Sequence, residues 1–162
     1  MKSQNNRLKN SLTLIVLALI AVLLGYLRDS IFKTINALLR AWDLSQDFYL
    51  PNYLTFLENF EYNTLVNLKW ALTLVFSILY LFLSIFAIKW LFNNKKQVNI
   101  TIFTYLAIIF LSGVFISIGL LWDASSDKMY EFARYLMGMA QSPIILMLLI
   151  PAFKLAEKEN MK

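Results

Sequence analysis

Four stretches without a charged residue constrain this chain more than any other feature. They cover residues 10–27, 70–88, 97–122 and 135–153, which are 18, 19, 26 and 19 residues long. A helix rises about 1.5 Å per residue and a bilayer core is about 30 Å thick, so each stretch is close to the length of one span. Backbone groups must pair internally in hydrocarbon, which favours helices, and the alternation typical of a membrane β-barrel is missing. We therefore predict an all-α fold, a four-transmembrane-helix bundle in a single membrane domain over residues 1–162, with spans at about 11–27, 70–92, 100–122 and 131–153.

The first stretch has an alternative interpretation as a cleaved signal peptide. Lys2, Arg7 and Lys9 would be its basic amino-terminal region. No small-x-small cleavage site precedes residues 26–28, so we expect the first stretch to remain as a span.

The distribution of charge predicts the orientation in the membrane. The two ends of the chain and the loop around Lys95 together hold nine basic and two acidic residues, whereas the remaining extramembrane segments hold six basic and eight acidic residues. Basic residues accumulate on the cytoplasmic side of membrane proteins. We therefore predict a multi-pass membrane protein with both termini in the cytoplasm. Because the basic residues flank apolar spans, the net charge of +5 indicates topology, and no nucleic acid partner is expected.

The composition excludes several classes of function. Hydrophobic residues make up 59% of the chain and charged residues 15%, and His and Cys are both absent. A chain without them has no imidazole base, thiolate nucleophile, disulfide, haem ligand or common zinc ligand of its own. It also has no glycine-rich phosphate loop, no paired carboxylates within a span and no Ser/Lys dyad placed for hydrolysis. We expect no catalytic residue, no metal site and no cofactor, and hence a protein that is not an enzyme.

The longest extramembrane segment is the outer loop, residues 28–69. Its first half has a helical period, with Ile31, Ile35 and Leu38 among the apolar positions of one face. This pattern predicts an amphipathic interfacial helix. Turn residues follow at 45–51, and an aromatic-rich segment comes after them. Two interpretations are open: aromatic anchoring at the level of the lipid headgroups, or a docking platform for a partner or a lipid.

Several polar residues lie near the outer membrane boundary and form a candidate rim or partner contact. They are Arg28, Asp29, Asn67, Lys69 and Arg134. Basic side chains at helix ends commonly snorkel to the interface, which would explain them without any site. The alternative is a polar pocket for an anionic headgroup or for a carboxylate of a partner. Apolar neighbours surround Arg134 in the sequence, so we expect this side chain to face inward.

A second set of candidate residues concerns kinking and helix packing: Gly113, Ser117, Gly138, Ser142 and Pro143. Gly113 with Ser117, and Gly138 with Ser142, are small-xxx-small pairs that permit close helix contact. Pro143 removes one backbone hydrogen bond and predicts a kink in the fourth span. The neighbouring polar side chains could satisfy the freed carbonyl, or they could contact a ligand or partner.

The end of the chain resembles a known group of proteins. Residues 131–154 read EFARYLMGMAQSPIILMLLIPAFK. This segment is similar to the carboxyl-terminal part of the small, four-span membrane proteins associated with exosortases in Bacteroidetes, the exosortase F- and exosortase X-associated proteins. Arg134, Pro143 and the Pro-Ala-Phe at 151–153 carry the resemblance, together with Arg28 and the polar segment 67–70.

The resemblance implies a non-catalytic accessory protein. Its partner would be an exosortase, a multi-span cysteine protease-transpeptidase that processes sorting signals on the outer face of the inner membrane. The partner would then supply the nucleophile and the base. Two other functions remain open: a membrane protein that binds a lipid or small molecule through the basic rim, and a structural subunit of a larger inner-membrane complex held together by its small-residue faces.

Overall fold

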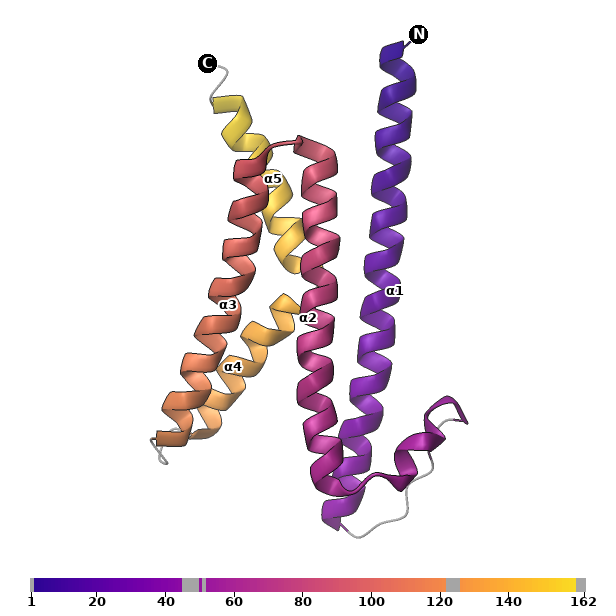
Figure 1. Ribbon diagram of the computed structural model, residues 1–162, viewed down its shortest axis with the longest axis vertical. Helices are drawn as coiled ribbons and strands as arrows, with labels where there is room; N and C mark the ends of the chain where they lie inside the picture. Colours follow the sequence, from indigo (N-terminus) through magenta and orange to yellow (C-terminus); the bar gives the residue numbers. More distant parts are fainter. Residues whose placement is uncertain (1, 45–49, 51, 122–125, 160–162) are drawn as a thin grey trace.

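The computed structural model describes residues 2–44, 50, 52–121 and 126–159, and all regular structure within them is helical (Figure 1). The elements in order are α1 (Lys2–Leu44), the 3₁₀ helix η1 (Asn52–Asn59), α2 (Tyr62–Phe92), α3 (Lys95–Leu121), α4 (Ser126–Ala140) and α5 (Ile144–Glu159). The prediction of an all-α fold is thus confirmed. The beginning of α1, the α2–α3 turn and the end of α5 lie at one end of the molecule, and η1 lies at the other (Figure 1).

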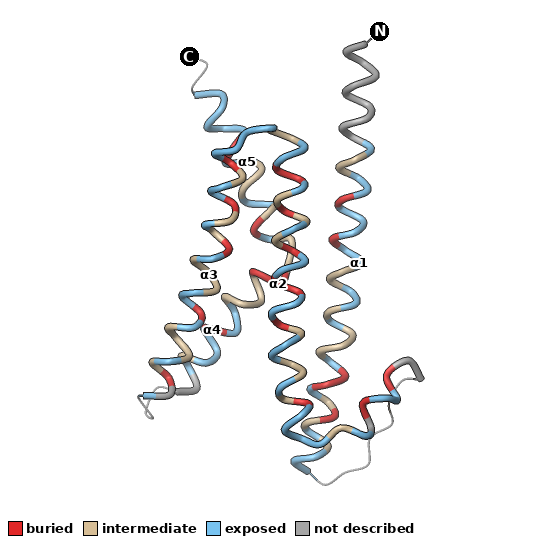
Figure 2. Tube along the Cα trace, viewed as in Figure 1, coloured by how far each residue is buried: buried red, intermediate tan, exposed pale blue. Residues whose placement is uncertain are grey.

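Three helices are long and apolar enough to cross a membrane: α1 from Leu12, α2, and α3 as far as Gly119. The predicted fourth span is instead two helices, α4 and α5, which are bent by 63° and meet the same criterion only as a pair. Large apolar side chains cover the outer surface. Phe82, Phe103 and Phe110 are 64%, 72% and 71% exposed, and exposed positions recur along every helix (Figure 2). Water would disfavour such a surface, so the structure indicates a multi-pass membrane protein with three to four spans.

The first helix combines two predicted segments. The sequence analysis placed a span at 11–27 and an interfacial helix after it, and both belong to α1, which continues unbroken to Leu44. The apolar face expected to lie on lipid packs within the chain: Ile35 and Leu38 form a buried cluster with Leu54 and Leu57 of η1 and Leu65 of α2. The turn predicted at 45–51 lies outside the described residues, except for Leu50.

A tight turn joins α2 to α3. Asn93 adopts the left-handed conformation (φ 48°), and its N–H donates to the carbonyl oxygen of Lys89. Asparagine tolerates this conformation better than most residues, so it can end a helix there. The side-chain oxygen of Asn94 accepts a hydrogen bond from the N–H of Lys96 at 2.9 Å and satisfies a free donor at the start of α3. The chain therefore reverses within two residues, and α2 packs antiparallel to α3.

The break between α4 and α5 lies at residues 141–143. Pro143 has no N–H to donate to the carbonyl oxygen of Met139, four residues earlier. That oxygen instead accepts from the N–H of Ser142 at 3.2 Å and from its hydroxyl at 2.9 Å. The local hydrogen bonds thus satisfy the carbonyl that proline leaves free, and α5 departs in a new direction (Figure 1).

The centre of the bundle is a cluster with one buried residue from each of the five α-helices. Its members are Ala21, Tyr80, Tyr105, Ala140 and Ile145. The Tyr80 hydroxyl donates to the carbonyl oxygen of Ala21 at 2.8 Å, which ties α2 to α1. A Cβ at Gly25 would lie 3.2 Å from the same hydroxyl, so the absence of a side chain there permits the close approach. This cluster separates the two ends of the bundle.

Candidate functional site: a cationic cleft

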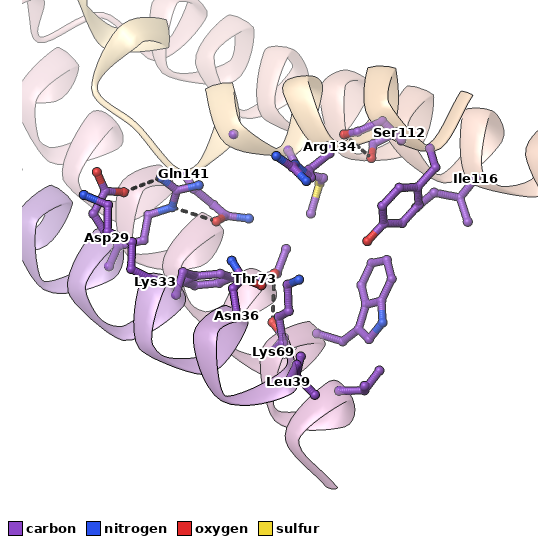
Figure 3. A pocket seen from close by; sticks show the side chains of 18 of the residues that line it. Asp29, Lys33, Asn36, Leu39, Lys69, Thr73, Ser112, Ile116, Arg134 and Gln141 are labelled. Carbon is purple, nitrogen blue, oxygen red and sulfur yellow. Dashed lines mark hydrogen bonds and ion pairs between the residues drawn. The ribbon is translucent and has the colours of Figure 1, made fainter. Parts of the chain in front are cut away.

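A cleft of about 470 Å³ lies beyond the central cluster, in the half of the bundle that faces away from the chain ends. Its walls come from 28–39 of α1, 62–73 of α2, 112–116 of α3, 130–138 of α4 and Gln141 in the break after α4 (Figure 3). Because α1 packs against α2 while α4 packs chiefly against α3, the cleft is a wedge between two helix pairs.

The charged residues of the cleft are predominantly basic. Arg28, Lys33, Lys69 and Arg134 line it, and Asp29 is the one acidic residue in its described lining. Phe32, Val66 and Met137 are among its apolar residues. Charges interact more strongly beside such low-dielectric walls than in bulk water. The cleft therefore carries a positive potential that attracts anions.

Arg28 is held by three contacts at the inner end of the cleft. Its Nε donates to the side-chain oxygen of Gln141 at 2.9 Å, and its NH1 lies 2.9 Å from a carboxylate oxygen of Asp29. Its guanidinium carbon also lies 5.4 Å from the centre of the Phe32 ring, within cation–π range. Gln141 lies in the break between α4 and α5, and its side chain is buried. The hydrogen bond from Arg28 therefore joins α1 to this break. Arg28 is thus largely compensated within the chain.

Lys69 and Arg134 are in a different situation. Both side chains point toward the open centre of the cleft, from α2 and α4 respectively (Figure 3). Their like charges repel each other. Among the ion pairs of the described residues, none neutralises either group. The two cations are therefore free to bind an external anion.

Four of the five predicted rim residues surround this one cleft: Arg28, Asp29, Lys69 and Arg134. Asn67 is exposed and lies outside the lining. Arg134, expected to face inward, lines the cleft but remains exposed. Lys33 and Gln141 were not among the candidate rim residues, but both line the cleft. An amide in a long apolar run, such as Gln141, was a signal for a buried polar contact.

The predicted small-residue pairs do not form close contacts between helices within the chain. A Cβ at Gly113 or Gly138 would meet no atom within 4 Å. Gly113 and Ser117 are both exposed, and the Ser117 hydroxyl donates to the carbonyl oxygen of Gly113 in the same helix. The close approach occurs one residue away, where the buried Ser112 hydroxyl donates to the carbonyl oxygen of Ala133 at 3.1 Å. The exposed Gly113–Ser117 face is therefore available for a contact outside the chain.

Replacing Gln141 with leucine is expected to destabilise the chain by about 1–2 kcal/mol, since the Arg28 Nε would lose its acceptor while the guanidinium kept Asp29. Asn67→Leu is the matched amide-to-leucine control and should change stability by less than about 0.5 kcal/mol, because Asn67 is exposed. Equilibrium unfolding by SDS in mixed micelles measures both. Equal effects of the two substitutions would contradict a structural role for the Arg28–Gln141 bond.

The charges of the cleft suit the binding of an anion. The described lining of the cleft contains hydroxyl, amide and cationic groups with a single carboxylate, and no group of three His, Cys, Asp or Glu side chains gathers within the described residues. No protein-family model, curated protein or solved structure matches this chain.

Proposed function

We propose that this chain is a non-catalytic accessory protein of the bacterial inner membrane that acts with an exosortase-type protein-sorting transpeptidase. In this proposal α4 and α5 together form a fourth span, and both termini are cytoplasmic. Support for the topology comes from the sequence, in which the two ends of the chain and the loop around Lys95 hold nine basic and two acidic residues. The choice of partner rests on the resemblance of residues 131–154 to exosortase-associated proteins.

The packing of residues 28–69, which we call the outer hairpin, is the observation that carries the accessory function. The outer hairpin consists of the end of α1, η1 and the first turns of α2, and its leucine and isoleucine side chains form a buried cluster of their own. A simple connection between two spans needs no such core. A packed segment presents a fixed surface, so it loses little conformational entropy when a partner binds.

Exposed aromatic side chains give the outer hairpin a surface suited to a protein partner. Trp42, Phe56 and Tyr62 are 53%, 57% and 39% exposed. Aromatic residues are enriched in protein interfaces and supply many of their binding hot spots. They are also enriched at the lipid headgroups, so the test must separate a protein contact from a lipid contact.

Site-specific photo-cross-linking in the native membrane makes this separation. We expect a photoreactive residue at Trp42 or Phe56 to capture a multi-span protein that carries the Cys, His and Arg of an exosortase. A probe at Trp90, which is a comparably exposed aromatic near the opposite end of α2, should not capture it. Deletion of the gene should also impair the processing of sorting signals. Lipid adducts alone at all three positions, with unchanged processing, would refute the proposal.

The cationic cleft supports a second candidate function, the binding of a lipid or small molecule. Lys69 and Arg134 point into the same open space without an acidic partner among the described residues. In this alternative, removing either charge should abolish ligand binding without disturbing assembly with a partner. The cleft shares residues such as Tyr62 with the outer hairpin, but Trp42 and Phe56 lie outside the cleft lining. Probes at these two positions therefore test the accessory function separately from ligand binding in the cleft.

A further inference from the structure

We propose that the cationic cleft binds the phosphate monoester headgroup of an anionic membrane lipid of the phosphatidic acid type. The inference rests on the second candidate function and names its ligand class, and it is independent of the identity of any protein partner. It requires that the helices cross a membrane, so that lipid reaches the cleft from the side.

The first step is the excess of positive charge. Asp29 is paired with Arg28, which leaves Lys33, Lys69 and Arg134 without a carboxylate in the described lining. Lys69 and Arg134 repel each other beside the apolar walls, and Lys33 adds a third positive charge to the same lining. An anion bound between them would remove that repulsion, so the charges of the cleft favour an anionic ligand.

The second step is the kind of anion. A phosphate monoester carries about −1.5 to −2 charges near neutral pH and three strong acceptor oxygens, whereas a carboxylate carries a single charge. Arginine can donate two parallel hydrogen bonds to phosphate, and lysine adds a mobile point charge. Arg134, Lys69 and Lys33 together therefore match a phosphate more closely than a single carboxylate in both charge and hydrogen-bonding capacity.

The third step is the attachment of that phosphate to a lipid. Tyr62, Trp70 and Tyr130 also line the cleft, and Trp and Tyr side chains concentrate at the depth of the lipid headgroups. The apolar residues of the lining, which include Val66 and Met137, suit hydrocarbon rather than a hydrated free ion. The lining comes from four helices, and several of its residues, such as Trp70 and Tyr130, are exposed on the outer surface, so acyl chains could leave the cleft sideways into the bilayer.

The size of the cleft agrees with these steps. A volume of about 470 Å³ is within the range of about 300–1,000 Å³ typical of small-molecule sites. It could hold a phosphate, its glycerol and the beginning of the acyl chains, while the remainder of the chains lies along the exposed apolar sides of the helices. We therefore expect one lipid per chain.

Native mass spectrometry of the purified chain, with defined lipids added to the detergent, tests the inference. We expect one molecule of dioleoyl phosphatidic acid to be retained per chain. The retained amount of dioleoyl phosphatidylcholine should be lower by about tenfold or more. Lys69→Gln and Arg134→Gln should each reduce retention of phosphatidic acid by about tenfold. Lys95→Gln is the control, because Lys95 is an exposed lysine at the opposite end of the bundle. Circular dichroism and gel filtration confirm that each variant is folded.

Each outcome decides the inference. Equal retention of the two lipids by the wild-type chain would overturn it without any variant, and so would full retention by the folded Lys69→Gln and Arg134→Gln chains. Inorganic phosphate is the second probe: displacement of the lipid by phosphate at similar concentration would assign the site to free phosphate and reject the lipid. Cross-links from Trp42 to a protein partner report on the accessory function, so either proposal can fail while the other stands.

Discussion

Replacing Ser112 with leucine is expected to destabilise the folded chain by about 2–4 kcal/mol, through overpacking and the loss of one hydrogen bond. Ser112 is 1% exposed and its hydroxyl donates to the carbonyl oxygen of Ala133, in the most extensive helix contact of the molecule, α3 with α4. A leucine side chain there must push the two helices apart. Because α4 carries Arg134 and ends at Gln141, the substitution should also widen the cleft.

The neighbouring Gly113→Leu substitution is the control for this prediction. It adds an even larger volume one residue away, but a Cβ at Gly113 meets no atom within 4 Å. We expect its free energy of unfolding to stay within about 0.5 kcal/mol of the wild type. Equilibrium unfolding by SDS in mixed micelles measures the free energy of unfolding of both variants. A stable Ser112→Leu chain, or an equally damaged Gly113→Leu chain, would show that α3 and α4 do not pack in this register.

The same pair of variants also addresses the structural-subunit function. If the exposed Gly113–Ser117 face contacts another protein, Gly113→Leu should release that protein from complexes isolated in mild detergent while leaving the chain itself stable. If the chain has no such contact, complexes should withstand the substitution. Ser112→Leu therefore tests the stability of the chain itself, and Gly113→Leu tests the stability of an assembly with another protein.

The gathering of four charged residues around one cleft could be predicted from the sequence for a topological reason. Arg28 ends one uncharged run, Lys69 precedes the next and Arg134 precedes the last. In an antiparallel bundle these boundaries fall at the same depth, so their side chains meet if the helices pack. An uncharged stretch as long as the bilayer core is thick has few possible structures other than a membrane-spanning helix. The charged residues at its ends therefore mark the depth of the membrane boundary.

Rotation about the helix axes could not be predicted in the same way. Ser112 and Gly113 differ by about 100° around α3, and a small-xxx-small spacing does not state which face meets a neighbour. The same limitation explains Asn67, which lies two positions from Lys69 and so points elsewhere. Gln141 was seen in the sequence, but its partner Arg28 is 113 residues away and no local pattern connects them.

The continuity of α1 has another physical cause. Arg28 and Asp29 mark where the chain meets water, but charge does not end a helix. The sequence has neither Gly nor Pro between Tyr26 and Leu44, so nothing in this segment favours a break. The predicted end of the span at residue 27 therefore marks where apolar sequence gives way to polar sequence. The helix itself ends about four turns later, at Leu44.

The largest single loss of stability is expected from Tyr80→Ala, at about 3–5 kcal/mol. Tyr80 is 1% exposed, and it packs in the cluster that draws one residue from each of the five α-helices. Its hydroxyl donates to the carbonyl oxygen of Ala21, and its own carbonyl oxygen accepts a bond from Tyr105 at 3.3 Å. Truncation would leave a cavity at the point where all five helices meet, and α1 would lose its central contact with α2.

Two further substitutions divide this effect into its parts. Tyr80→Phe keeps the ring and removes only the hydroxyl, so it should cost about 0.6–1.7 kcal/mol, the range of hydrogen bonds between membrane helices. Phe82→Ala removes an aromatic ring from a lipid-facing position that is 64% exposed, and it should have little effect because lipid fills the space. If Tyr80→Phe were as damaging as Tyr80→Ala, the hydrogen bond to Ala21 rather than the packed ring would hold α1. If Phe82→Ala were as damaging as Tyr80→Ala, the central cluster would not be the core of the bundle.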